Sequence, residues 1–294
     1  MFRLPKKIFN PGNIIGLGES SHGSSTESNW KHNLILDHIR SNKDKKIVFY
    51  LEAYEDPIHE LLEKIKNNDS LIEVNIKSCL NKLYKIWQTQ EIYNLLLSLA
   101  KLSMNDGVQI EIHGVDFRNP NEKKSMDQEK MLKSHSYIIF NNIKKHYCKD
   151  AIHFFSAHNM HVGKYVIEKQ KDVGKFLIEE FGQKYVSIAQ HTSRGLMRAR
   201  NSNGIYEQVE FAFEKTHNSV TALADRIFKN KKSDEPVIIP TSDTLLKNTN
   251  LIEQAGFYWP LEEYWLMEIN QEHFDYLTIH KKGEASQALI ITSK

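Results

Sequence analysis

Residues 13–23, Asn13-Ile-Ile-Gly-Leu-Gly-Glu-Ser-Ser-His-Gly23, carry the signal that decides the fold. A short apolar run ends at a glycine-containing turn, and the next residues, Ser24-Ser-Thr-Glu27, form a capping box with Ser24 as the N-cap. The apolar run predicts a strand, and the capping box predicts that a helix begins directly after it. A strand followed at once by a helix is typical of α/β folds.

The same alternation continues along the chain. Further short apolar or β-branched runs, which predict strands, lie at 47–51, 108–112, 151–155, 185–189 and 237–240. Helical patterns lie between the runs, at 25–40, 57–67, 79–104, 122–147 and 172–181. Two late runs, 274–280 and 288–292, are expected to form final strands, and the polar stretch 201–204 a surface loop. We therefore predict an α/β fold, a mostly parallel β-sheet flanked by helices, in a single domain over residues 1–294.

The composition limits the class of partner. Lys and Arg number 39 against 37 Asp and Glu, a formal net charge of +2, which argues against nucleic acid or a polybasic membrane face. No apolar run reaches the roughly 18 residues that a membrane span requires. We therefore expect a small-molecule or peptide substrate as the partner. The chain has two cysteines, and its first residues lack the apolar core of a secretory signal, which predicts a reducing, cytoplasmic location.

Titratable side chains follow four of the predicted strands. Ligands of open α/β sheets collect beyond the carboxyl ends of the strands, so these residues are the first candidates for a site. They are Glu19 and His22, Glu52, Asp116, and His158 with His161. Each alone is explained more simply as a buried, hydrogen-bonded group or a surface carboxylate, because perturbed groups mark sites only loosely. Four such strand ends along one sheet edge favour a functional site.

His22 is placed directly before the predicted helix that Ser24 caps. The positive end of the helix macrodipole disfavours a protonated imidazole, which predicts a neutral ring able to act as a general base. Glu19 could oppose this shift, or it could hold the ring in one tautomer by accepting its other N–H. For Glu27, capping is a sufficient explanation, and Lys31, four residues on, is correctly spaced for a helical ion pair with it.

The segment Ser156-Ala-His-Asn-Met-His-Val-Gly163 places two histidines three residues apart, with Asn159 between them. With the carboxylates of the other strand ends, these imidazoles could hold a zinc or manganese ion, although a His-x-x-His spacing alone is a weak signal. The metal-free interpretation makes His158 an acid/base or an electrophile for a developing oxyanion, with Asn159 as a fixed donor. Two satisfied histidines in a turn are the third alternative.

Several well-known motifs are missing from the chain. It has no Gly-x-Ser-x-Gly elbow and no Walker phosphate loop, and Gly16-Leu-Gly18 lacks the third glycine of a dinucleotide-binding loop. The sequence therefore disfavours a nucleotide cofactor, and we predict no cofactor and no metal. Without an evident Ser or Cys nucleophile, the expected chemistry is attack by water that a side chain deprotonates.

The motifs resemble those of the erythromycin esterase family, which hydrolyses macrolide lactones and includes members described as succinoglycan biosynthesis proteins. The resemblance keeps order and spacing along most of the chain, in the segments Gly16–Gly23, Phe49–Glu52, Trp87–Glu91, His113–Phe117, Ala157–Val162, Val173–Gly174, Phe181–Ile188 and Phe274–Leu277. It implies that His22 is the general base, that Glu19 and Glu52 orient the water, and that no metal is required. The resemblance also implies that His158 and His161 line the wall of the site opposite His22.

The remaining candidates form the predicted substrate-binding wall, which comprises His161, Asn159, Asp116, Lys31, Arg194 and Trp87. Relatives often carry a basic residue where Lys31 stands, so a substrate contact competes there with the helical ion pair. Arg194, together with Arg198 and Arg200, could bind a carboxylate or phosphate, and a solvated basic turn is the competing explanation. The aromatic residues of 258–265 could supply walls for a substrate, but packing into the core is the simpler account.

These observations support three hypotheses about function. The first is a metal-independent hydrolase of an ester, lactone or related acyl bond of a small natural product, and not a true macrolide esterase, because the chain is shorter than most macrolide esterases. The second keeps the site but uses it for cyclisation, elimination or peptide modification in a biosynthetic pathway, since fold does not determine reaction. The third is a metal-binding or ligand-binding protein without turnover.

Overall fold

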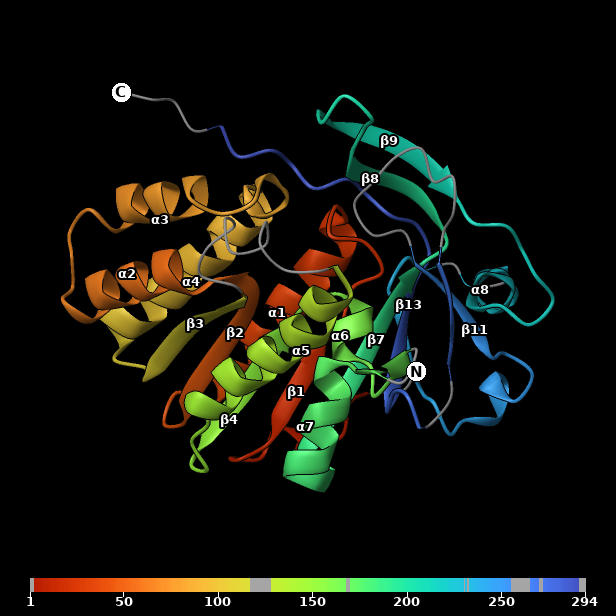
Figure 1. Cartoon of the computed structure of the whole chain (residues 1–294), viewed down its shortest axis with the longest axis horizontal. Helices are drawn as coiled ribbons and strands as arrows, with labels where there is room; N and C mark the ends of the chain where they lie inside the picture. The colour runs from red at the N-terminus through yellow and green to blue at the C-terminus, as the bar shows by residue number, and fades with distance from the viewer. Residues whose placement is uncertain are drawn as a thin grey trace.

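The computed structural model describes residues 3–116, 128–167, 170–229, 231, 233–254, 265–269 and 272–290. A seven-stranded sheet forms the centre, in the order β10-β13-β7-β1-β4-β2-β3 (Figure 1). Its strands are β1 Ile14–Leu17, β2 Lys46–Tyr54, β3 Ile110–Asp116, β4 Ala151–Ser156, β7 Tyr185–Thr192, β10 Val237–Pro240 and β13 Tyr276–His280. All neighbours are parallel except β10, which pairs antiparallel with β13. The prediction of a mostly parallel α/β sheet is confirmed.

Helices cover both faces of the sheet. They are α1 Ser25–Ser41, α2 Glu55–Lys66, α3 Ile72–Asn81, α4 Gln90–Asp106, α5 Gln128–Lys145, α6 Asn159–Val162, α7 Val173–Phe181 and α8 Val220–Phe228. Helices α5 and α7 pack on one face, and α1 and α4 on the other (Figure 1). Successive strand residues alternate between these two cores, as Ile14 and Ile15 do. Burial on both faces explains why the strands read as continuous apolar runs.

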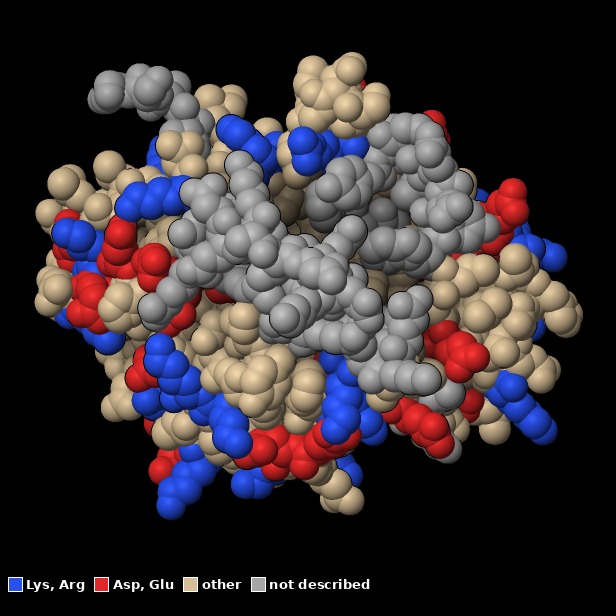
Figure 2. All heavy atoms as spheres, in the orientation of Figure 1, with Lys and Arg blue, Asp and Glu red and all other residues tan. Residues whose placement is uncertain are grey.

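Three two-stranded ribbons lie outside the central sheet. They are β5 Val166–Ile167 with β6 Gln170–Lys171, β8 Arg194–Arg200 with β9 Tyr206–Ala212, and β11 Leu251–Gln254 with β12 Trp265–Glu268. Short 3-10 helices span Lys6–Phe9, Lys85–Trp87, Gly182–Lys184 and Thr244–Leu246. Among the described helices, none combines the length and apolar character that a bilayer crossing requires. Figure 2 shows basic and acidic side chains interspersed across one face of the molecule.

The predicted helix at 79–104 is wrong, because the chain forms two helices there. Helix α3 ends at Asn81, and α4 begins at Gln90 after a 3-10 turn. Thr89 is the reason for the second start, since its side chain accepts from the N–H of Ile92 and caps α4. The break turns Trp87 inward, where it is buried.

Two further expectations need correction. Residues 288–290 form no strand: Ala288 makes only an isolated bridge to Thr89, and Leu289 N donates to Gln88 O. The segment runs along the beginning of α4 because its backbone pairs there instead of at a sheet edge. The segment with the three arginines, expected as a possible basic turn, is strand β8. Its Met197 and Ala199 pack with residues of β9 in a small separate core. The expected loop at 201–204 is the turn of this hairpin, whereas residues 255–264, with most of the aromatic segment, lie outside the described residues.

Buried histidines give the fold an expected sensitivity to acid. Of the residues that the structure describes, six buried histidines have a pKa lowered to about 3 or 4, chiefly by burial: His32, His113, His153, His158, His191 and His280. An unfolded chain binds these protons near pH 6.5, whereas the folded chain does not. The contribution of these six histidines to stability is therefore complete above pH 6.5 and is lost as the pH falls toward 3.

We expect the free energy of unfolding to fall below pH 6.5 by up to about 1.4 kcal/mol per pH unit for each such histidine. Urea unfolding at a series of pH values from 8 to about 4 measures this loss. Replacing the exposed His59 by alanine should leave the pH dependence as it is. A urea concentration at half-unfolding that stays the same below pH 6.5 would contradict the prediction.

Candidate active site

The loop between β1 and α1 is held by Glu27. Ser24 caps α1 as predicted, with its Oγ accepting from Glu27 N at 3.2 Å. The Glu27 carboxylate, however, accepts from Ser20 N and Ser20 Oγ, both at 2.6 Å, and from Thr192 Oγ1 at 2.8 Å. Burial raises the pKa of Glu27. This side chain therefore anchors the loop that carries Glu19 and His22, which capping alone did not predict.

Glu19 joins a histidine and a lysine in a buried chain. Its Oε1 lies 2.6 Å from His22 Nδ1, and its Oε2 accepts from Lys31 Nζ. Burial raises the pKa of Glu19, but Lys31 and His22 together lower it to about 2. The helical ion pair expected between Lys31 and Glu27 is wrong, because Glu27 is engaged with the loop and the fully buried Lys31 turns to Glu19 instead.

The structure changes the expected electrostatics of His22. Burial lowers its pKa, but the hydrogen bond with Glu19 and the charge of Glu52 raise it more, and the net direction is upward from 6.5. The expected depression of this pKa by the helix macrodipole is therefore wrong. Glu19 acts on the ring through a direct contact of 2.6 Å, and the charge of Glu52 adds to it. The bond from Nδ1 to Glu19 sets the tautomer that leaves the lone pair of the neutral ring on Nε2.

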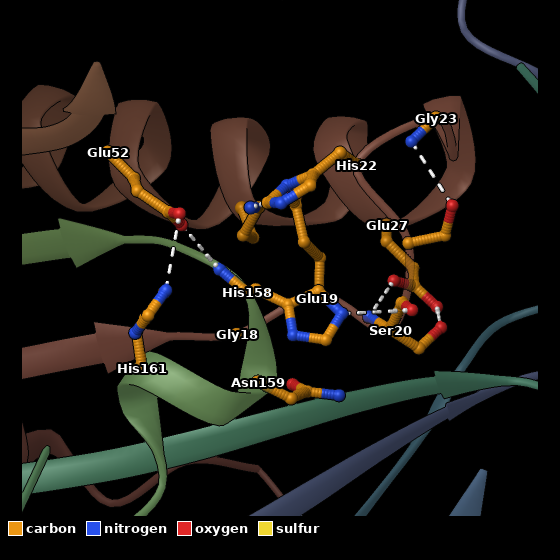
Figure 3. Close-up of polar contacts among 12 residues, drawn as sticks. Gly18, Glu19, Ser20, His22, Gly23, Glu27, Glu52, His158, Asn159 and His161 are labelled. Atoms are coloured by element: carbon orange, nitrogen blue, oxygen red, sulfur yellow. Dashed lines mark hydrogen bonds and ion pairs between the residues drawn. The ribbon is translucent and has the colours of Figure 1, made fainter. Parts of the chain in front are cut away.

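Glu52 contacts both His158 and His161 (Figure 3). Its Oε2 accepts from the backbone N of His158 at 2.9 Å, and its Oε1 lies 3.5 Å from His161 Nε2. The rings of His22 and His158 are 5.3 Å apart. The strand ends of β1, β4 and β2 thus bring these four residues together.

The His158 ring makes contacts with the backbone on both sides. Its Nδ1 accepts from Met160 N at 3.3 Å, and its Nε2 lies 3.3 Å from Ser20 O. Burial lowers the pKa of His158 to about 3, with the charges of His22 and His161 acting in the same direction. This neutral ring joins α6 to the Glu19–His22 loop, a geometry that favours a supporting role over proton transfer.

Asn159 is fully buried and its amide is engaged within the protein. Its Nδ2 donates to Gln190 O at 2.7 Å and to Gln254 Oε1 at 3.0 Å, and its Oδ1 accepts from Gln190 N at 3.1 Å. A Cβ atom at Gly18 would lie 2.1 Å from Asn159 Oδ1, so only glycine allows this approach. Asn159 therefore fastens the site to β7, and the geometry does not favour its predicted contact with substrate.

Asp116, Trp87 and Arg194 complete the sequence candidates. Asp116 Oδ1 lies 2.7 Å from His135 Nε2, and the ring of His135 is 5.5 Å from that of His161. The Trp87 ring lies 5.0 Å from the His22 ring. Both are thus beside the cluster, whereas Arg194 is exposed at the beginning of β8.

Arg198 and Arg200 differ from each other, and neither lies in a turn. Arg198 is buried, with its Nη1 donating to Lys85 O at 3.1 Å and its guanidinium 5.1 Å from the centre of the Tyr206 ring. Arg200 is exposed at the end of β8. Both belong to strand β8, and the contacts with Lys85 and Tyr206 account for the burial of Arg198.

Sequence reasoning missed three residues near His161. Asp172 Oδ1 lies 2.9 Å from His161 Nδ1 and accepts from Ser136 Oγ at 2.9 Å, and His135 lies beyond. Asp172 directly precedes α7 and accepts from Val173 N at 2.7 Å, so an N-cap signal was readable in the sequence. His135 and Ser136 lie within α5 and carry no comparable signal. Within the described ranges, no group of three or more His, Cys, Asp or Glu side chains is arranged to hold a metal ion.

Solved structures share this fold over nearly their whole length. A protein from Bacillus cereus is 18% identical, with a TM-score of 0.75, and the match covers 96% of this chain and 91% of that one. A succinoglycan biosynthesis protein is 14% identical, with a TM-score of 0.76 and the same two coverages. A mutant of the erythromycin esterase EreC in its open conformation is 12% identical, with a TM-score of 0.67, covering 95% of this chain and 93% of that one. No curated protein matches the chain in sequence.

Fold and site together define an α/β protein whose parallel strands deliver a histidine and carboxylate cluster to one sheet edge. Residues 138–282 match the family model described as erythromycin esterase. This match and the shared fold support an erythromycin esterase-like family for the chain. At the level of the family, this similarity supports a hydrolase-like function.

Proposed function

We propose that this protein hydrolyses an ester, lactone or related acyl bond of a small molecule, using water that His22 deprotonates. The observation that carries the proposal is the buried Glu19–His22 pair, in which a 2.6 Å contact to Nδ1 orients the ring and Lys31 balances the carboxylate. A base oriented in this way by a carboxylate is the arrangement used to activate nucleophiles in hydrolases.

The proposed reaction has two steps. His22 Nε2 takes a proton from water while the oxygen forms a bond to the acyl carbon, which gives a tetrahedral oxyanion. The bond from that carbon to the leaving oxygen then breaks, and the proton on His22 passes to the leaving oxygen. His161, whose pKa neighbouring carboxylates raise to about 10 against the effect of burial, supplies positive charge near the developing oxyanion. We assign this role to His161 rather than His158, because the carboxylates beside His161 favour its cation, whereas burial lowers the pKa of His158 to about 3.

Product mass tests the reaction. A panel of small esters, lactones and a macrolide is incubated with the protein in water enriched in the heavy oxygen isotope. Hydrolysis places one heavy oxygen in the acid product, and the His22→Ala variant serves as the control for turnover. Products that carry no solvent oxygen would refute hydrolysis and favour the elimination or cyclisation alternative. The macrolide belongs in the panel because the fold match covers 93% of the EreC chain.

A further inference from the structure

A second imidazole–carboxylate chain lies on the side of Glu52 that faces away from the Glu19 pair. His161 Nδ1 is 2.9 Å from Asp172 Oδ1, and its Nε2 is 3.5 Å from Glu52 Oε1. Figure 3 shows the His161 ring pointing toward the Glu52 carboxylate. The ring is therefore placed between two carboxylates that come from different elements, β2 and the N-cap of α7.

Asp172 is itself held firmly. Its Oδ1 accepts from Ser136 Oγ at 2.9 Å and from Val173 N at 2.7 Å, and its backbone N donates to Tyr165 O at 3.1 Å. The residue is 7% exposed. An N-cap position at the beginning of α7 also places its negative charge where the helix macrodipole favours it. Asp172 can therefore hold another group in place without moving.

The geometry determines the protonation state of His161. Carboxylates accept hydrogen bonds and cannot donate them, so a nitrogen that faces one needs its own proton. Both nitrogens of His161 face a carboxylate, and with both carboxylates ionised each nitrogen needs a proton, which is the imidazolium form. The other titratable groups around the ring are Asp116 on β3, His135 on α5 and His158 at the beginning of α6. The nearby carboxylates outnumber the cations, which agrees with the raised pKa of His161.

We propose that Asp172 is a positioning residue that keeps His161 cationic and directs its Nε2–H toward Glu52, which fixes the Glu52 carboxylate in the site. The consequence for catalysis rests on the proposed function, since Glu52 acts on His22 through its charge. Without Asp172, His161 would lose the closer of its two carboxylates, and its Nε2 would no longer be held in place toward Glu52. Capping of α7 does not by itself explain why Asp172 also contacts His161.

Histidine side-chain NMR titration of the full chain tests this proposal without any substrate. Asparagine caps helices as well as aspartate does, so Asp172→Asn removes the charge and keeps the cap. We expect the pKa of His161 to fall by about one to three pH units in this variant, the effect of losing an opposite charge at hydrogen-bonding distance. His153, buried on β4, is the internal reference and should titrate as in the unchanged protein.

Asp116→Asn is the matched control. It removes the same charge from the same neighbourhood, but Asp116 contacts His135 rather than His161, so its effect on the pKa of His161 should be clearly smaller. An unchanged His161 pKa in Asp172→Asn, or equal shifts in both variants, would overturn the proposal. If Asp172→Asn fails to fold, the unchanged protein still decides, because a His161 that titrates near 6.5 contradicts the assignment. These results stand or fall separately from hydrolysis, since no turnover is measured.

Discussion

Replacing His22 by alanine should lower kcat/KM for any ester or lactone that the protein hydrolyses by about 10²–10⁴-fold, the usual contribution of a positioned general base. The expected loss is large because the base that is removed is one that Glu19 orients through a 2.6 Å contact. Steady-state kinetics of the variant and the unchanged protein measure it. The exposed His59 offers a matched control, and His59→Ala should retain full activity.

The pH dependence of the same reaction gives an independent check. A base acts in its deprotonated form, so kcat/KM should rise with pH through the pKa of His22, which lies above 6.5. His161 acts as a cation, so the rate should fall again as the pH approaches about 10. An activity that survives in His22→Ala, or a rate that falls between pH 6 and 8, would show that His22 is not the base.

Lys31→Met should destabilise the protein by about 3–5 kcal/mol, the range found when one partner of a buried ion pair is removed. Lys31 and Glu19 are each 1% exposed, and burial of an uncompensated carboxylate is costly. Urea unfolding at neutral pH measures the loss. Lys66→Met, which breaks the exposed pair with Glu63, should change stability little.

The double variant Lys31→Met with Glu19→Gln separates charge from packing. Glutamine keeps an oxygen that can accept from His22 but carries no charge, so this variant should regain a large part of the stability lost in Lys31→Met. If Lys31→Met were as stable as the unchanged protein, the buried pair would not be an electrostatic unit. If the double variant were no better than the single one, the loss would come from packing of the lysine chain.

Local patterns predicted much of the fold and the residues around the site. The β1 run and the Ser24 cap were readable, because a continuous apolar run and a capping side chain depend only on nearby residues. The strand ends that carry Glu52 and Asp116 were found for the same reason. The break between α3 and α4 was missed because the apolar pattern continues across it, and only the cap at Thr89 marks the new helix.

The partners of the site residues were much harder to predict. Lys31 is spaced for Glu27 along one helix, yet it contacts Glu19, because the loop turns the Glu27 carboxylate toward Ser20 and Thr192. Asp172 and His161 are eleven residues apart, and nothing local connects them. Contacts of this kind follow from the placement of whole elements.

The sequence by itself placed His22, Glu52, Asp116 and His158 at the carboxyl ends of strands of a parallel sheet, since strand ends and helix starts are local properties; in the structure Glu52 and Asp116 are still part of β2 and β3. Only the tertiary structure decided that β4 lies between β1 and β2. That order seats the His158–His161 turn beside both Glu19 and Glu52, whereas chain order would place β2 next to β1. Neighbouring strands are chosen by packing of both sheet faces against helices distant in sequence, a property of the whole chain that no short pattern contains.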